Sequence, residues 1–247
     1  MKILVCISSV PDTTSKINFT ADKSAFDKNG IQWVINPHDE FVLTKAIKLQ
    51  EAGATVTVLN VGDAGTEPVI RKALAIGAND AIRVNLDPQD SFQTAKEIAA
   101  VAQNGGYDLI LMGKESIDYN GAAVPGMVAQ LLDKPFVNAC VGLDINGSEA
   151  TAVREIEGGK ETVAVALPAI IAGQKGLVSE TELIIPNMRG IMSARTKPLQ
   201  VVEATTGEVK VKGVSFDSVP ARAAVKLVSP DNLDELVRLL HEEAKVI

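Results

Sequence analysis

The chain has 247 residues, of which 46% are hydrophobic and 22% are charged, with a net charge of −7. This composition predicts a soluble globular protein with a core that needs no cross-links, and it excludes a disordered or fibrous chain. The net negative charge argues against nucleic-acid binding through overall charge, and a membrane span would need a continuous apolar run of about 18 residues, which is missing.

Two cysteines, Cys6 and Cys140, are too few for a disulfide framework, and each lies in an apolar run typical of a buried free thiol. The N-terminal apolar stretch is too short for the core of a signal peptide. We therefore expect a cytoplasmic protein without membrane insertion.

Short β-branched runs alternate with helical patterns through the first half of the chain. We predict strands at residues 2–8, 54–61, 82–84 and 108–113. We predict helices that begin at Asp39, near Pro68, at Ser91, which can cap its helix, and at about residue 121. The alternation indicates βαβ units and a Rossmann-like, mostly parallel sheet flanked by helices.

The pattern changes after Phe136, where apolar strands follow one another through turns at residues 146–147 and 158–159. This predicts an antiparallel extension of the sheet. Residues 174–200 carry apolar side chains among charges, too irregularly for one amphipathic helix, and residues 201–230 look extended before a final helix. We predict an α/β domain over residues 1–192, with a partner-recognition loop at about 174–195, and a C-terminal arm over 193–247.

Ligands of parallel α/β sheets bind outside the carboxyl ends of the strands, which directs attention to the loops that follow them. Residues 8–14, 35–40 and 114–129 are three such loops, and the third has glycines and small residues that lead into a helix. Free backbone N–H groups and the helix dipole suit a phosphate there. Neither a Walker loop nor GxGxxG is present, so an ordinary helix cap and strand-end packing remain equally open.

Groups for acid–base or nucleophilic catalysis are scarce. The chain has two histidines, His38 and His241, and neither cysteine has a catalytic neighbourhood. We therefore expect neither an active site nor a metal site. Glu155 and Glu157 alternate on a predicted strand and share one face, either solvated or paired with an interface cation.

One segment carries a specific resemblance. VREIEGGKETVAVALPAII, residues 153–171, resembles the signature of the β subunits of electron transfer flavoproteins. Supporting matches are ILVCISSVPD (3–12), INPHDE (35–40), IRKALAIGANDAIRV (70–84), LILMGKESID (109–118) and GIMSARTKPL (190–199). The resemblance implies an adenine nucleotide α hydrolase-like fold and an electron carrier subunit rather than an enzyme.

In that family the β subunit pairs with a larger α subunit that holds most of the FAD, and it binds AMP in most members. The resemblance places the nucleotide contacts on Cys6, Asn36, Pro37, His38, Asp39, Val61, Asp118, Tyr119, Asn120, Gly121, Ala122, Ala123, Val124, Pro125, Gly126, Met127, Val128 and Ala129.

The third loop departs from the family pattern. Where many members have Asn-Gln-Thr-Gly, this chain has Ala122, Ala123, Val124 and Pro125, so an anion must rely on backbone N–H groups and the helix dipole. Electron-bifurcating relatives hold a second FAD in this pocket. Ala122 and Val124 fit their pattern, while Gly121 and Ala123 do not, so this alternative stays open.

The resemblance also implies partners. Met188, with Ile191 and Met192, matches the loop that docks on acyl-CoA dehydrogenases, and a membrane quinone oxidoreductase would receive the electrons. Glu155 would pair with an arginine of the α subunit, on which the C-terminal arm would pack, whereas Thr13 replaces an aromatic residue near the flavin. The rival class, an adenine-nucleotide hydrolase or transferase, would need glycines that residues 8–11 lack.

Overall fold

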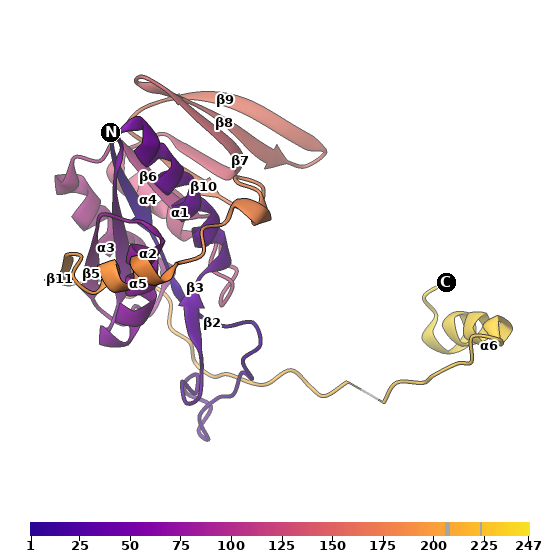
Figure 1. Cartoon of the computed structure of the whole chain (residues 1–247). Coiled ribbons are helices and arrows are strands. Elements are labelled where there is room, and N and C mark those ends of the chain that lie inside the picture. The colour runs from indigo at the N-terminus through magenta and orange to yellow at the C-terminus, as the bar shows by residue number, and fades with distance from the viewer. Residues whose placement is uncertain (206–207, 223) are drawn as a thin grey trace. The chain divides into compact units, whose positions relative to one another are not determined.

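A nine-stranded sheet organises the described part of the computed structural model, which comprises residues 1–205, 208–222 and 224–247. The strand order is β11-β5-β4-β1-β6-β10-β7-β8-β9 (Figure 1). The strands are β1 (Lys2–Cys6), β4 (Thr55–Gly62), β5 (Asp80–Asn85), β6 (Leu109–Gly113), β7 (Phe136–Asn146), β8 (Glu149–Ile156), β9 (Gly159–Ala166), β10 (Ala169–Gly173) and β11 (Leu199–Glu203).

From β11 to β7 all neighbouring strands are parallel, whereas β7, β8 and β9 pair in antiparallel fashion. Every residue of β6 and β10 is buried, as expected of parallel strands with both faces covered by helices. The predicted α/β fold with an antiparallel extension is confirmed. A separate two-stranded ribbon pairs β2 (Ser9–Pro11) with β3 (Trp33–Ile35).

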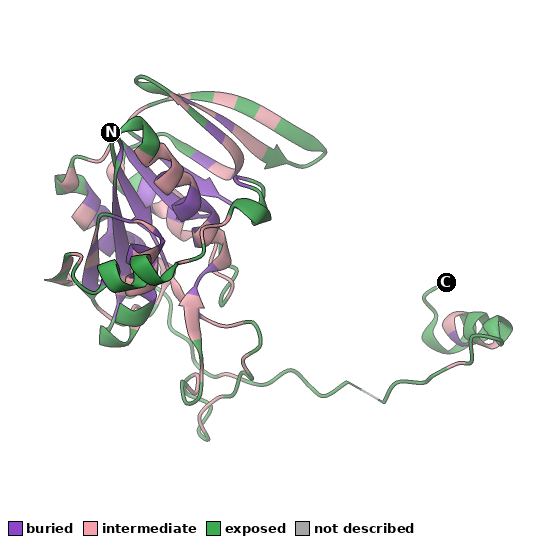
Figure 2. Ribbon diagram, viewed as in Figure 1, coloured by how far each residue is buried: buried purple, intermediate pink, exposed green. Residues whose placement is uncertain are grey.

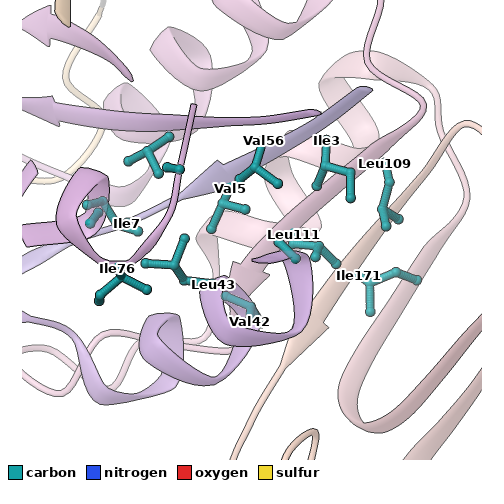
Figure 3. Close-up of a cluster of buried hydrophobic side chains, with 14 of the residues drawn as sticks. Ile3, Val5, Ile7, Val42, Leu43, Val56, Ile76, Leu109, Leu111 and Ile171 are labelled. Atoms are coloured by element: carbon teal, nitrogen blue, oxygen red, sulfur yellow. The ribbon is translucent and has the colours of Figure 1, made fainter. Parts of the chain in front are cut away.

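Helices cover both faces of the sheet. Side chains of α1 (Pro37–Leu49) and α2 (Glu67–Ile76) pack on one face with Ile3, Val5 and Leu111 (Figure 3). Side chains of α3 (Ser91–Gly105) and α4 (Val124–Leu132) pack on the other face. None of the helices in the described ranges is long and apolar enough to cross a bilayer.

The structure differs from the sequence-based expectations in three elements. Asp90, not Ser91, caps α3, because the Asp90 carboxylate accepts a hydrogen bond from the backbone N–H of Gln93. β8 ends at Ile156, so Glu157 lies in the turn and does not share a strand face with Glu155. The irregular stretch 174–200 contains a 3-10 turn (Glu180–Glu182) and a short helix, α5 (Met188–Ala194).

The last strand of the sheet lies outside residues 1–192, which were predicted to form the α/β domain. β11 pairs in parallel with β5, although its sequence lies in the region predicted as an arm. By its contacts the chain divides into two units, Met1–Ile17 with Lys28–Val214, and Asn18–Asp27 with Ser215–Ile247. The α/β unit thus ends later than the predicted residue 192.

The smaller unit joins a loop near the N-terminus to the C-terminal residues. Phe19 stacks on Phe216 with 5.4 Å between ring centroids, and Lys23 pairs with Asp217. Its helical part is α6 (Leu233–Arg238), continued by a π-helical turn (Leu239–Ala244). Most side chains of this unit are exposed, including several large apolar ones (Figure 2).

Candidate functional site

The candidate site lies at the carboxyl ends of β1, β4 and β6. Cys6, the last residue of β1, lies opposite Leu59 on one side and Met112 on the other. One apolar cluster unites Cys6 with residues predicted to line the nucleotide site from distant parts of the sequence: Val61, Val124, Met127, Val128 and Ala129. These residues thus pack together beneath the loops of the candidate site.

A buried carboxylate joins the three loops above this apolar cluster. One oxygen of Asp39 accepts a hydrogen bond from the N–H of Ser8 at 2.7 Å, and the other accepts one from the N–H of Gly113 at 2.8 Å. Burial raises the pKa of Asp39 to about 7, and the hydrogen bonds from Ser8 and Gly113 oppose this rise only in part. Both carboxylate oxygens of Asp39 therefore fix the backbone at Ser8 and Gly113.

Asn36 makes a second set of links between the same loops. Its side-chain amide donates to the carbonyl of Glu115 at 2.9 Å and accepts from the N–H of Ile117 at 3.2 Å. Its own N–H donates to the carbonyl of Ser8 at 3.0 Å. Because all three contacts are local to the pocket, Asn36 fixes the relative positions of residues 8, 36 and 115–117.

His38 adds a neutral polar group to the site. Burial lowers the pKa of His38, and the nearby Lys114 lowers it further, whereas Glu115 opposes the shift. Its Nε2 lies 3.9 Å from a carboxylate oxygen of Glu115. Its Nδ1 is buried and has no hydrogen-bond partner among the described residues, so it can still bond to a ligand or to water.

The loop before α4 presents backbone donors. Asn120 and Ala122 both have a φ of +48°, in the left-handed region, where non-glycine residues are uncommon. Within the described structure the N–H groups of Gly121, Ala122 and Ala123 donate no hydrogen bond. No side chain caps α4, and Pro125 near its start lacks an N–H. Free N–H groups at a helix N-terminus bind anions.

Other predicted site residues lie apart from this cluster or have partners of their own. Tyr119 is 80% exposed, and Thr13 lies in an exposed turn. Glu155 accepts a hydrogen bond from Gln174. Burial raises the pKa of the Cys6 and Cys140 thiols, which keeps both in the poorly nucleophilic protonated form.

Two cavities lie elsewhere on the molecule. One, of about 240 Å³, lies against β7 and β9, and the other, of about 290 Å³, borders Tyr107, Lys134 and Pro168. Neither is lined by a residue predicted to bind nucleotide.

In the recognition loop, residues 174–195, Leu177 and Val178 are buried, contrary to the exposure expected of Leu177, and the exposed apolar side chains lie at 185–192. Met188 is 73% exposed, so it does not fold back into the core, and Ile191 and Met192 are also exposed. Ile185, one of the exposed apolar residues expected in this stretch but not one of those predicted to dock, is 85% exposed. Pro186 disfavours helix at the preceding residue, and Ile185 lies outside α5.

Comparison with known proteins identifies the family. The model of the electron transfer flavoprotein domain matches residues 24–206. The electron transfer flavoprotein subunit beta of Bacillus subtilis (strain 168) is 34% identical, with all of both chains aligned. The chain belongs to the electron transfer flavoprotein β-subunit family. The β subunit of Syntrophomonas wolfei is 37% identical over 91% of this chain and 88% of its own.

The family membership extends to distant relatives. The human electron transfer flavoprotein subunit beta is 29% identical over 100% of this chain and 99% of its own. The alignment of whole chains includes the C-terminal residues outside the α/β unit. Residues of both units are therefore included in the alignments with electron transfer flavoprotein β subunits, and the name of the family implies a role in electron transfer.

Proposed function

We propose that this chain pairs with an α subunit in the cytoplasm and that the heterodimer carries electrons from acyl-CoA and other dehydrogenases to a membrane quinone oxidoreductase. The observation that carries the proposal is the full-length similarity to β subunits of electron transfer flavoproteins. The absence of an assembled acid–base or nucleophilic set among the described residues agrees with a carrier, since neither thiol is activated and the pKa of His38 is lowered.

The redox group of the proposed heterodimer is FAD, which accepts electrons and passes them on when bound. We assign most of its binding to the α subunit. The residues of this chain would bind the α subunit and position it, through β8 and the C-terminal unit. The carboxylate of Glu155 would accept a hydrogen bond from an arginine of the α subunit, in place of the bond from Gln174 or in addition to it.

We propose that the candidate site holds AMP. The apolar cluster that includes Cys6 and Val61 fits an adenine ring, and the N–H groups of Gly121, Ala122 and Ala123 fit a phosphate. The unpartnered Nδ1 of His38 supplies a further polar contact inside the site. Asn36 and Asp39 would act by holding the loops, because their polar atoms already bond to the backbone.

The recognition loop is the proposed dehydrogenase-docking surface. Its exposed apolar residues lie beside Arg189 and Arg195, which form no ion pair among the described residues. In a chain with a net charge of −7, this local positive charge suits a partner with an apolar pocket bordered by carboxylates. Apolar anchors inside a charged rim are typical of the centre of an interface.

The test is to coexpress this chain with the α subunit from the same genome and analyse the purified complex. We expect a yellow heterodimer that an acyl-CoA dehydrogenase reduces in the presence of its substrate. Mass spectrometry of the released nucleotides should find FAD and AMP in equal amounts. Two FAD per heterodimer without AMP would instead support the bifurcating alternative. A colourless protein that forms no complex, or that hydrolyses ATP, would contradict the proposal.

A further inference from the structure

Helix α5, which carries Met188, Ile191 and Met192, lies directly against α2 (Figure 1). The backbones of the two helices lie close together at Gly190. A Cβ atom added to Gly190 would lie 2.4 Å from the carbonyl oxygen of Ala75, a backbone atom that cannot rotate away. Glycine is therefore required at this position by the spacing of the two helices.

Polar side chains fix the C-terminal end of the same helix. One guanidinium nitrogen of Arg71, on α2, donates to the carbonyls of Ala194 at 3.0 Å and Lys197 at 2.9 Å. In return, the amine of Lys197 donates to the carbonyls of Leu74 at 2.9 Å and Ala78 at 2.6 Å. Ala194 and Leu74 lie in the last turns of α5 and α2, where carbonyl groups have no partner within the helix, and Lys197 and Ala78 lie just beyond these helices.

The N-terminal end of α5 is fixed as well. The side chain of Asn187 caps the helix by accepting a hydrogen bond from the N–H of Gly190 at 2.8 Å. A helix of seven residues is too short to be stable alone, so its conformation depends on these contacts. The face turned away from α2 presents the two methionines to solvent.

We propose that Gly190 and Arg71 are positioning residues that hold α5 ready for docking before a partner binds. Docking then costs little conformational entropy, because the helix that bears the apolar anchors is already ordered. The inference rests on the proposed docking function of the recognition loop. It adds that affinity for the partner depends on two residues that the partner does not contact.

The first test compares heterodimers that carry Gly190→Ala and Gly159→Ala. The control glycine has open space around an added Cβ and no positive φ. We expect Gly190→Ala to raise the KM of an acyl-CoA dehydrogenase for the heterodimer about 10-fold, with kcat and bound FAD unchanged, because the helix must shift. Gly159→Ala should leave the KM unchanged. Equal KM values for the two variants would overturn the proposal.

The second test does not depend on a close packing contact. Arg71→Met removes the bonds to the carbonyls of Ala194 and Lys197, whereas Glu67→Gln removes only the ion pair that Arg71 forms at 3.1 Å. We expect Arg71→Met to raise the KM and to accelerate hydrogen exchange in α5, and Glu67→Gln to do neither. Unchanged exchange in the Arg71→Met variant would contradict the positioning role.

A double variant separates this inference from the docking function itself. If Met188→Ala alone leaves the KM unchanged, docking through this residue is contradicted. If Met188→Ala raises the KM and Gly190→Ala does not, docking stands and the positioning role fails. If both raise it, their combined effect should be smaller than the sum of the two in free energy, because both act on the same contact.

Discussion

At the scale of single residues, Asp39 decides whether the candidate pocket has a fixed shape. Its carboxylate accepts backbone hydrogen bonds from Ser8 and Gly113, residues that the sequence separates by more than a hundred positions. Asparagine at this position would turn an N–H₂ group toward one of those N–H donors and leave it buried and unpaired.

We therefore expect Asp39→Asn to lower the free energy of unfolding by about 1–3 kcal/mol, the cost of an unsatisfied buried donor. Chemical denaturation of the purified protein measures this difference. Asp133→Asn, at an exposed helix end, provides the control and should change stability little. An Asp39→Asn variant as stable as the wild type would show that the two backbone bonds contribute nothing.

The same residue predicts a pH dependence. The pKa of Asp39 is raised to about 7 in the folded protein by burial, from an ordinary value near 3.8. Between these values the folded protein keeps a proton that the unfolded chain has lost, so the free energy of unfolding decreases as pH rises through this window. The stability advantage of wild type over Asp39→Asn should thus be larger at pH 5 than at pH 8, as measured by denaturation at both values.

Sequence reasoning predicted which residues surround the proposed pocket but not the hydrogen bonds between them. The resemblance places nucleotide contacts on Asn36 and Asp39, which lie in one of the loops expected at the carboxyl ends of the strands. Their hydrogen bonds to residues 8, 113, 115 and 117 depend on loops that meet only in three dimensions. Hydrogen bonds between loops that are distant in sequence cannot be predicted from a local sequence pattern.

At the scale of elements, α4 tests the nucleotide proposal. Its N-terminus has no side-chain cap, and Ala123 occupies the capping position. Ala123→Asp would place a negative charge where the phosphate is proposed to bind, although carboxylates otherwise stabilise helix N-termini. We expect the AMP content of the purified heterodimer to fall about 10-fold in this variant, and to be retained in the neutral, similarly shaped Ala123→Asn. Full AMP content in Ala123→Asp would place the phosphate elsewhere.

Elements differ in how readily the sequence reveals them. β1, β4 and β6 are apolar runs buried between two helical layers, so their composition alone predicts them. β11 is an edge strand of mostly exposed or half-buried residues and carries Gln200 and Glu203, so it resembles a loop. α5 is seven residues long and exists through contacts with α2, which helical periodicity does not detect.

At the scale of the whole molecule, the division into two units predicts the result of a truncation. Within the described ranges, all nine strands of the large sheet, and the β2–β3 ribbon, lie before Ser215 in the larger unit. A chain that ends at Val214 should therefore retain a cooperative thermal unfolding transition near that of the full chain. If the C-terminal residues pack on the α subunit as proposed, the truncated chain should fail to copurify with it. Copurification at the full-length yield would contradict that role.

The strand order has a consequence for synthesis of the chain. β6, entirely apolar except for its glycine and buried throughout, pairs with β1 on one side, but its other neighbour, β10, begins only at Ala169. Until β10 arrives, a growing chain has an apolar strand with one unpaired edge, which is a template for association with other chains. Fragments of the chain that end between β6 and β10 should therefore aggregate more readily than the full chain.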